Sequence, residues 1–357
     1  MNNKKQSFWQ KLVNSSVFYT ILSIIFGFIV GAIALLIAGY NPITSYAEMG
    51  NRIFGSVKGM SYSFVEYATP YIMTGLSVAF AFKTGVFNIG AEGQYVVGSI
   101  FGCLVAIFVP APKWLLVPLC LIVAMLAGTL WGVVVGWLKV RFGVNEVLSM
   151  IMFNWIAYYL SNFIVKLDAV EVGGGKTWTK IIQDNAKITL PDMNHTLSSK
   201  VHAGIFIAII AVVIVYFIID KMTLGYRLKA VGYNSYAAKF AGINVDKNIM
   251  IALGISGALA ALGGCMQVLG VTYKVSQFAG QEGYGFNGIT VALIGSCNPF
   301  GVLLAGFFFG AMKFAGLRFG PPSEVVDIMM GCITFFIAIS SLLKEIFTKN
   351  NQTGGAV

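Results

Sequence analysis

Long runs without a charged residue divide this chain into segments of the length that crosses a membrane. A transmembrane helix needs about 20 mostly apolar residues, and a charge at its centre costs about 2.5 to 3.5 kcal/mol. Nine charge-free blocks occur: Val17 to Ala38, Tyr67 to Phe82, Gly93 to Pro112, Trp114 to Leu138, Val147 to Val165, Val201 to Ile219, Asn248 to Tyr273, Gly283 to Met312 and Ile328 to Leu343. The eighth is 30 residues long and contains Asn298-Pro299-Phe300-Gly301, a turn sequence that ends a helix in lipid. We therefore predict an all-α, polytopic membrane protein with about ten transmembrane helices.

The composition supports this fold class and excludes several functions. With 57% hydrophobic and 11% charged residues, the chain has too few charges to cover soluble domains, which excludes a soluble enzyme. The net charge of +10 comes from basic residues scattered between apolar runs, which predicts contact with anionic membrane lipid and not with nucleic acid. The five cysteines form no close pairs, and His195 and His202 have no carboxylate at ligand spacing, so no metal site is predicted.

Ten spans place both termini on one side of the membrane, and the short connections indicate which side. Lys139 and Arg141 lie in a short connection on the side of the N-terminus, against Lys113 alone on the other side, which favours cytoplasmic termini. We predict a cytoplasmic N-terminus at 1–16, a single transmembrane domain at 17–345 and a cytoplasmic tail at 346–357. Within the transmembrane domain, 166–200 is predicted to be an outer loop and 220–247 a cytoplasmic segment.

Two glycine-rich segments, 80–95 and 279–289, interrupt the apolar pattern close to the predicted membrane. Non-helical backbone at that depth needs buried protein partners or a water-filled cavity, and many transporters build substrate sites from such broken helices. Each segment contains a Phe-Asn pair, and the two pairs are 199 residues apart: Phe87-Asn88 and Phe286-Asn287. We therefore expect two pseudo-repeated halves whose breaks meet and line or support a substrate pathway.

Three further polar residues belong to this predicted pathway. Glu92 is a carboxylate near membrane depth, which favours a functional role, but it follows Gly90 at a helix start, where an anion is also stabilised structurally. Both roles stay open. Gln94 is a polar partner in the same segment, and Asn154 belongs to a third Phe-Asn pair. A ring beside an amide suits a flat, polar ligand.

The cytoplasmic segment 220–247 has the pattern of a short amphipathic helix between glycine stops. Its apolar residues alternate with polar ones, and Ala237-Ala238 is followed by Gly242. Small side chains let a helix lie close against the surface of a partner, which an ordinary solvated loop does not need. The segment is therefore predicted to be a docking element.

Three strings in the sequence resemble the permease subunits of ATP-binding-cassette importers for nucleosides, within the larger group that also serves ribose, galactoside and branched-chain amino acid uptake. They run from Thr84 to Gln94, from Gly225 to Ile243, and from Gly285 to Gly295 followed by Asn298-Pro299. The resemblance covers nearly the whole chain from about Tyr67. It implies that 220–247 couples the permease domain to an ATPase subunit through six residues: Gly232, Tyr233, Asn234, Ala237, Ala238 and Gly242. Tyr236 stands where the coupling motif has Glu, so a salt bridge from that position is not implied.

The resemblance also implies the partners. The chain contains no phosphate-binding loop of the G-x-x-x-x-G-K-[ST] type, so it is not expected to hydrolyse ATP by itself. The resemblance implies a subunit that is not an enzyme and has no cofactor, with ATP bound by a partner subunit. The implied assembly pairs this chain with a second, homologous permease in the plasma membrane. A cytoplasmic ATPase with two fused domains and a substrate-binding lipoprotein complete it, and the implied substrate is a nucleoside.

Other substrates and one other class of transporter stay open at this point. Permeases of the same scaffold carry simple sugars or branched-chain amino acids. An ion-coupled secondary carrier has similar broken helices, but it needs no docking segment and more often has titratable groups in its pathway, where Glu92 alone qualifies. A membrane-embedded enzyme is not supported, because no span has paired carboxylates or paired histidines at helical spacing.

Overall fold

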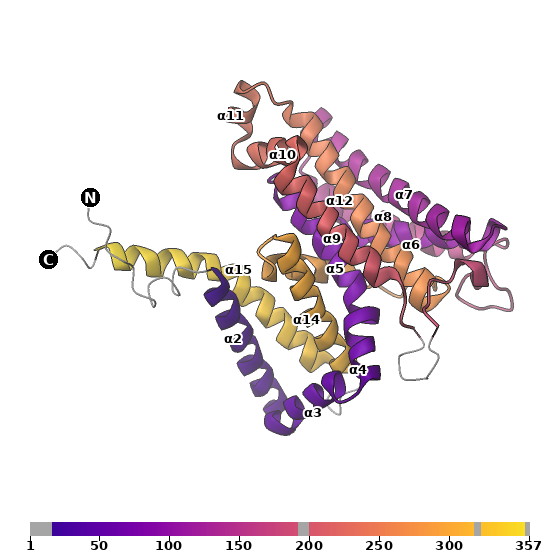
Figure 1. The fold of residues 1–357 in the computed structure, drawn as a ribbon, viewed down its shortest axis with the longest axis horizontal. Helices are drawn as coiled ribbons and strands as arrows, with labels where there is room; N and C mark the ends of the chain where they lie inside the picture. Colours follow the sequence, from indigo (N-terminus) through magenta and orange to yellow (C-terminus); the bar gives the residue numbers. More distant parts are fainter. Residues whose placement is uncertain (1–15, 192–199, 318–322, 354–357) are drawn as a thin grey trace. The chain divides into compact units, whose positions relative to one another are not determined.

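The computed structural model describes residues 16–191, 200–317 and 323–353. The chain forms two compact units: a larger one, Phe54–Ala311, and a smaller one made of the described residues that precede Phe54 and those that follow Ala311. Most of the described residues are helical, and their β structure is limited to three isolated bridges (Figure 1). The predicted all-α class is confirmed.

Ten of the helices overlap the ten predicted spans. They are α2 (Ser16–Ile37), α5 (Ala68–Phe82), α6 (Ala91–Phe108), α7 (Lys113–Phe142), α8 (Glu146–Val165), α9 (Gly204–Lys221), α12 (Val245–Gln267), α13 (Tyr284–Ile294), α14 (Pro299–Leu317) and α15 (Ser323–Thr353). The eighth block is divided between α13 and α14 at its turn sequence, as predicted. Seven of the described helices are long and apolar enough to cross a membrane, whereas α13, with 11 residues, is too short to do so alone.

The remaining helical elements are short. They are α3 (Pro42–Phe54), α4 (Val57–Ser61), the π-helix η1 (Tyr62–Tyr67), the 3-10 helix η2 (Asp184–Ala186), α10 (Thr223–Tyr233), α11 (Ser235–Phe240) and the π-helix η3 (Val268–Thr272). Because α4, η1 and α5 follow one another directly, the chain is helical from Val57 to Phe82. The second charge-free block begins only at Tyr67 because Glu66 precedes it. In the structure Glu66 lies within the continuous helix and is only 6% exposed.

Helix α12 is the centre of the larger unit and packs against α5, α6 and α7. Small residues dominate its sequence between Gly254 and Gly264. The helices are so close that two glycines leave no room for a side chain. If Gly257 carried a Cβ atom, it would lie 2.1 Å from the carbonyl oxygen of Gly128 on α7. A Cβ atom on Gly98 of α6 would lie 2.2 Å from the carbonyl oxygen of Ala261 on α12. Such close backbone contact is typical of helices that associate within a membrane.

In the smaller unit, α2 and α15 pack against each other. A Cβ atom on Gly27 would lie 2.1 Å from Cγ1 of Ile333, so the two helices are in close contact there. Tyr46 of α3 donates a hydrogen bond of 2.6 Å to the carbonyl oxygen of Phe28 on α2. The first and the last predicted spans are therefore neighbours within this unit.

The predicted outer loop is held by hydrogen bonds over its described part, 166–191. The backbone N–H of Thr179 donates to the carbonyl oxygen of Val275 at 2.9 Å, and that of Ile182 donates to Tyr273 at 2.9 Å. The loop thus covers the segment that follows η3. His195 lies outside the described residues. His202, just before α9, is fully buried and accepts a hydrogen bond from the N–H of Gly204.

Candidate functional site

The first predicted break is present and is held together by one buried amide. Helix α5 ends at Phe82, α6 begins at Ala91, and the residues between them are not helical. The Asn88 side chain is fully buried; its Nδ2 donates to Oγ of Ser256 at 2.6 Å and to Oε1 of Gln94 at 2.9 Å. Its Oδ1 accepts from the N–H of Gly90 at 3.0 Å. Asn88 therefore ties the break to α6 and to α12, which satisfies polar groups that lipid would leave unpaired.

Asn154 of α8 holds the start of α6 from the other side. Its Oδ1 accepts a hydrogen bond of 2.8 Å from the N–H of Gly93, and its Nδ2 donates to the carbonyl oxygen of Ile89 at 3.1 Å. The side chain is 2% exposed. Both hydrogen-bonding ends of this amide are thus occupied by the protein backbone, and the third Phe-Asn pair supports the first break.

Glu92 connects the two breaks directly. Its Oε1 accepts from the N–H of Gly283 at 2.8 Å and its Oε2 from the N–H of Gly285 at 2.7 Å. These N–H groups belong to the first turn of α13, where four donors lack partners within the helix and an anion is favoured. The carboxylate, 1% exposed, therefore caps a helix other than its own. The predicted meeting of the two broken segments is present.

The second Phe-Asn pair does not have the geometry of the first. Phe286 and Asn287 lie within the first turn of α13, after the non-helical segment 273–283, whereas Asn88 precedes its helix. Asn287 is half-buried, and the described residues give its side chain no hydrogen bond. Phe87 is half-buried against Phe82, with ring centroids 5.1 Å apart. The pseudo-repeat in sequence is therefore not a repeat of local structure.

The predicted cytoplasmic segment, 220–247, forms two short helices, where one was predicted. Helix α10 ends at Tyr233, and Asn234, in extended conformation, starts α11 by accepting a hydrogen bond of 3.0 Å from the N–H of Ala237. Three aromatic side chains are almost fully exposed there: Tyr233 at 89%, Tyr236 at 79% and Phe240 at 94%. Ala237 is exposed, but Ala238 is only 4% exposed and packs within the chain.

Helix α10 touches the first break through two glycines. A Cβ atom on Gly232 would lie 2.5 Å from the carbonyl oxygen of Lys83 and 3.0 Å from the nitrogen of Gly85. Gly85 has a left-handed backbone, with φ of +71°, and a Cβ atom there would lie 3.2 Å from Cα of Gly232. No side chain larger than hydrogen fits between these backbones, so a displacement of α10 acts directly on the break.

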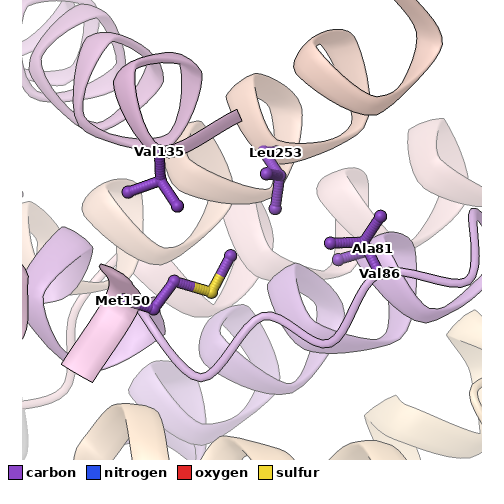
Figure 2. Packing of buried hydrophobic residues seen from close by; sticks show 5 residues of the cluster. All are labelled: Ala81, Val86, Val135, Met150 and Leu253. Carbon is purple, nitrogen blue, oxygen red and sulfur yellow. The ribbon is translucent and has the colours of Figure 1, made fainter. Parts of the chain in front are cut away.

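Val86, the residue after Gly85, anchors the first break in the hydrophobic core. Val86 is 2% exposed and belongs to a cluster with one residue from each of α5, α7, α8 and α12 (Figure 2). These are Ala81, Val135, Met150 and Leu253. The break is thus packed between four helices at the same end of the larger unit as α10.

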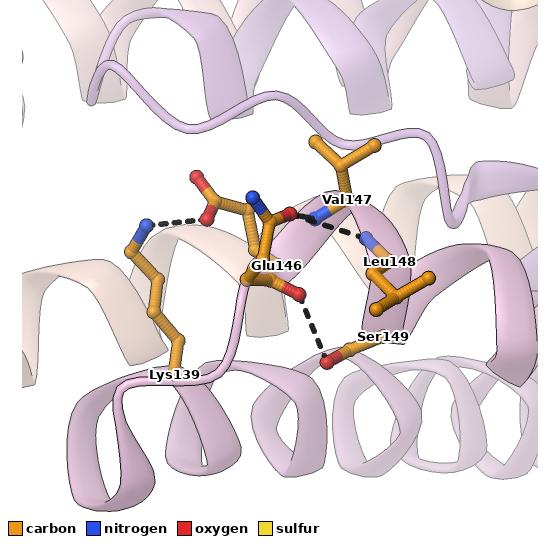
Figure 3. A network of polar contacts seen from close by, with 6 residues as sticks. Lys139, Glu146, Val147, Leu148 and Ser149 are labelled. Carbon is orange, nitrogen blue, oxygen red and sulfur yellow. Dashed lines mark hydrogen bonds and ion pairs between the residues drawn. The ribbon is translucent and has the colours of Figure 1, made fainter.

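A hollow of about 420 Å³ lies beside the two glycines and is lined by residues of the break, of α7 and of the α10–α11 turn, including Thr84, Lys139 and Asn234. Lys139 forms an ion pair of 2.6 Å with Glu146, which joins the end of α7 to the start of α8 (Figure 3). Asn145 accepts hydrogen bonds from the N–H groups of Val147 and Leu148 and so caps α8.

A second cavity, of about 320 Å³, lies beside the second break. It is lined by residues of α6, α12, η3 and the second break, and by Lys200: Tyr95, Ser99, Lys200, Gly264, Gln267, Val268, Val271, Thr272, Lys274, Val275, Ser276, Phe278, Glu282 and Tyr284. None of the seven predicted pathway residues lines it. Tyr95 lies three residues after Glu92, and Tyr284 lies between the two glycines that Glu92 binds. The hydrogen bonds of Glu92 therefore bring Tyr95 and Tyr284 into the same cavity wall, which the sequence does not indicate.

Comparisons with known proteins identify the family. Residues 61–338 match the model of the branched-chain amino acid transport system / permease component. The guanosine ABC transporter permease protein NupP of Bacillus subtilis (strain 168) is 40% identical over 346 residues, which cover 95% of this chain and 98% of that protein. The nucleoside ABC transporter permease protein NupB of Lactococcus lactis subsp. cremoris (strain MG1363) is 34% identical over 98% of this chain and 95% of its own length.

The glucose ABC transporter permease protein TsgB13 of Haloferax volcanii is 31% identical over 91% of this chain and 88% of its own length. No solved structure matches the chain. The family model covers most of the chain, and the first two relatives match it over nearly their whole length. The chain is therefore a multi-pass membrane protein that belongs to the family of branched-chain amino acid transport system permease components, a transport subunit and not an enzyme.

Proposed function

We propose that this chain is the permease subunit of an ATP-binding-cassette importer that moves nucleosides across the plasma membrane. The guanosine and nucleoside permeases among its relatives, at 40% and 34% identity, support this substrate class over the glucose permease at 31%. Membership of the permease family counts against the ion-coupled secondary carrier. A simple sugar is the second candidate substrate because of the glucose relative.

The contact between Gly232 and Gly85 is the observation that carries the mechanism. An importer needs a path from the site of ATP hydrolysis to the substrate pathway. Here the exposed aromatic side chains of the α10–α11 region offer a surface to an ATPase subunit, and α10 touches the break behind that surface. The break is joined by Asn88 to α12 and, through Glu92 on α6, to α13. A push on α10 thus reaches both broken segments.

The same arrangement supports the proposed orientation. Lys83 and Lys139 lie at the end of the larger unit that carries α10, while the 166–191 loop covers the segment after η3. We place α10 and α11 in the cytoplasm, the loop outside, and both termini in the cytoplasm. The proposed partners are a second, homologous permease, a cytoplasmic ATPase with two fused domains, and a substrate-binding lipoprotein that delivers the nucleoside from outside.

For the predicted pathway residues we propose a supporting role. Asn88, Glu92, Gln94 and Asn154 are at most 2% exposed, and each side chain makes a hydrogen bond within the protein, so none of them is presented to a substrate. Phe87, Phe286 and Asn287 are half-buried. The four buried polar residues hold the broken helices in register, so their substitution should affect transport through the shape of the pathway.

Uptake measurements test the function. Cells that lack their own nucleoside importers would express this chain with its partner subunits, and uptake of labelled guanosine, adenosine and uridine would be compared with glucose, ribose and leucine. Nucleoside uptake that depends on ATP and on this chain is the expected result. Uptake of glucose or leucine without any nucleoside would refute the substrate assignment.

A further inference from the structure

The cavity of about 320 Å³ has the size and the lining of a small-molecule site. Sites for small molecules span roughly 300–1,000 Å³ and combine apolar or aromatic walls with a few polar groups. This cavity lies within the larger unit, between α6, η3 and the second break. Val275 and Ser276 in its wall are bonded to the 166–191 loop, so the cavity faces the proposed outer side.

One wall of the cavity is aromatic. The rings of Tyr95 and Tyr284 are stacked, with centroids 4.9 Å apart and an interplanar angle of 26°. Phe278 also lines the cavity, and its backbone is fixed by Asn162 of α8, which accepts from its N–H at 2.8 Å and donates to its carbonyl oxygen at 3.0 Å. Stacking on aromatic side chains is the sequence-tolerant way in which proteins hold nucleobases.

Two polar groups of the lining have no partner. The hydroxyl of Tyr95, a residue that is 1% exposed, and Oε1 of Gln267 are buried and have no hydrogen-bond partner among the described residues. Buried polar groups are nearly always paired in folded proteins, so two unpaired groups in one cavity wall indicate a missing partner. The charged Lys274 is engaged with the ring of Trp178, whose centroid is 4.0 Å from its Nζ, and the two unpaired groups of the buried wall are neutral.

We propose that this cavity is a nucleoside site of the permease itself, in which the base lies against the Tyr95–Tyr284 wall and hydrogen-bonds to Gln267 and to the Tyr95 hydroxyl. The proposal rests on the proposed import function. A base supplies both a flat face and polar edges without net charge, whereas leucine has two charges and no flat face. Glu92 fixes the site, because it holds Gly283 and Gly285 on either side of Tyr284 and lies one helical turn before Tyr95.

Conservative variants test the site. Tyr95→Phe and Gln267→Leu each remove one unpaired polar group and keep most of the volume, so the fold should be retained. Each should lower kcat/KM for guanosine uptake by the complete transporter roughly three- to tenfold, the change that one neutral hydrogen bond corresponds to. Tyr19→Phe is the matched control, because the Tyr19 hydroxyl on α2 is also buried and unpaired. Ligand affinity of the binding lipoprotein should not change.

A direct measurement locates the ligand. Membranes with the complete transporter would be illuminated with 8-azidoguanosine, and labelled peptides would be mapped by mass spectrometry. Labelling between residues 264 and 284 that excess guanosine suppresses is the expected result. If the unaltered transporter imports nucleosides while both variants match it and the label lies elsewhere, the site is wrong and the import function stands. If the unaltered transporter imports no nucleoside, the function and the site fall together.

Discussion

The carboxylate of Glu92 accepts a hydrogen bond of 2.7 Å from the backbone N–H of Gly285, 193 residues later in the chain. This contact, with its companion to Gly283, joins the start of α6 to the start of α13. Of the two roles that the sequence left open for Glu92, the contact favours the structural one, because the acid caps a helix.

Replacing Glu92 by Gln should destabilise the larger unit by about 2 to 3 kcal/mol, because the amide accepts through one oxygen only and a hydrogen bond to a charged group is worth more than a neutral one. Thermal unfolding of the purified chain in detergent, followed by gel filtration, measures the loss. Glu48→Gln is the control, since Glu48 forms an exposed ion pair with Arg52 and should change stability by less than about 1 kcal/mol. Equal stability of the two variants would show that the cap is not made.

The two Phe-Asn pairs should respond differently to substitution. Asn88→Ala removes the buried amide that bonds to Ser256, to Gln94 and to the N–H of Gly90, so it should lower the amount of folded protein and abolish uptake. Asn287→Ala removes a half-buried side chain without a hydrogen bond and should leave folding intact. Expression, thermal stability and uptake of the two variants side by side check this asymmetry, and equal effects would contradict it.

Gly232→Ala should uncouple ATP hydrolysis from transport. The added methyl group would lie 2.5 Å from the carbonyl oxygen of Lys83, so α10 must move away from the break, at a cost of about 1 to 3 kcal/mol. We expect the ATPase subunit to bind and hydrolyse ATP while uptake falls. Gly50→Ala is the control, because no atom lies within 4 Å of a Cβ at that position. Normal uptake in Gly232→Ala would exclude the contact from coupling.

The docking surface should depend on Ala237 and the exposed aromatic side chains, and not on Ala238. Ala237→Glu and Phe240→Ala should weaken copurification of the ATPase subunit without changing stability, since both residues are exposed. Ala238→Glu should instead destabilise the chain, because it buries a charge. Tyr159→Ala, which removes a side chain 64% exposed on α8, serves as the control. Undiminished copurification in both surface variants would place the ATPase elsewhere.

Cysteine labelling tests the proposed orientation. Asp168→Cys lies in the 166–191 loop and Lys239→Cys in α11, and both positions are exposed. A membrane-impermeant maleimide should label the first in sealed cells and the second only after permeabilisation. The unaltered chain gives the background, since three of its five cysteines are buried and two are half-buried. Labelling of Lys239→Cys in sealed cells would reverse the topology.

The local properties of this protein could be predicted from its sequence. The boundaries of the spans follow from the cost of placing charges in lipid, which each segment shows by itself, and all ten predicted spans overlap helices. The breaks after Phe82 and before Tyr284 follow from glycine-rich runs between apolar ones. The sequence did not predict that 220–247 is divided into two helices at Asn234. An asparagine fits both a polar position within one helix and the N-cap of a second helix, and the sequence alone does not distinguish the two.

The functional geometry was decided by the tertiary structure alone. Nothing near Glu92 in the sequence indicates that its carboxylate binds Gly285, and nothing near Tyr95 indicates that its ring stacks on Tyr284. The partners in these contacts are about 190 residues apart, and they meet because Gly285 lets the start of α13 lie directly against the start of α6, where a Cβ atom would overlap the backbone of Glu92. A charge-free run indicates that a segment is stable in lipid, but it does not indicate which other segments that segment contacts. The contact between two glycines such as Gly85 and Gly232, and the cavity beside Tyr284, exist only once the helices have packed.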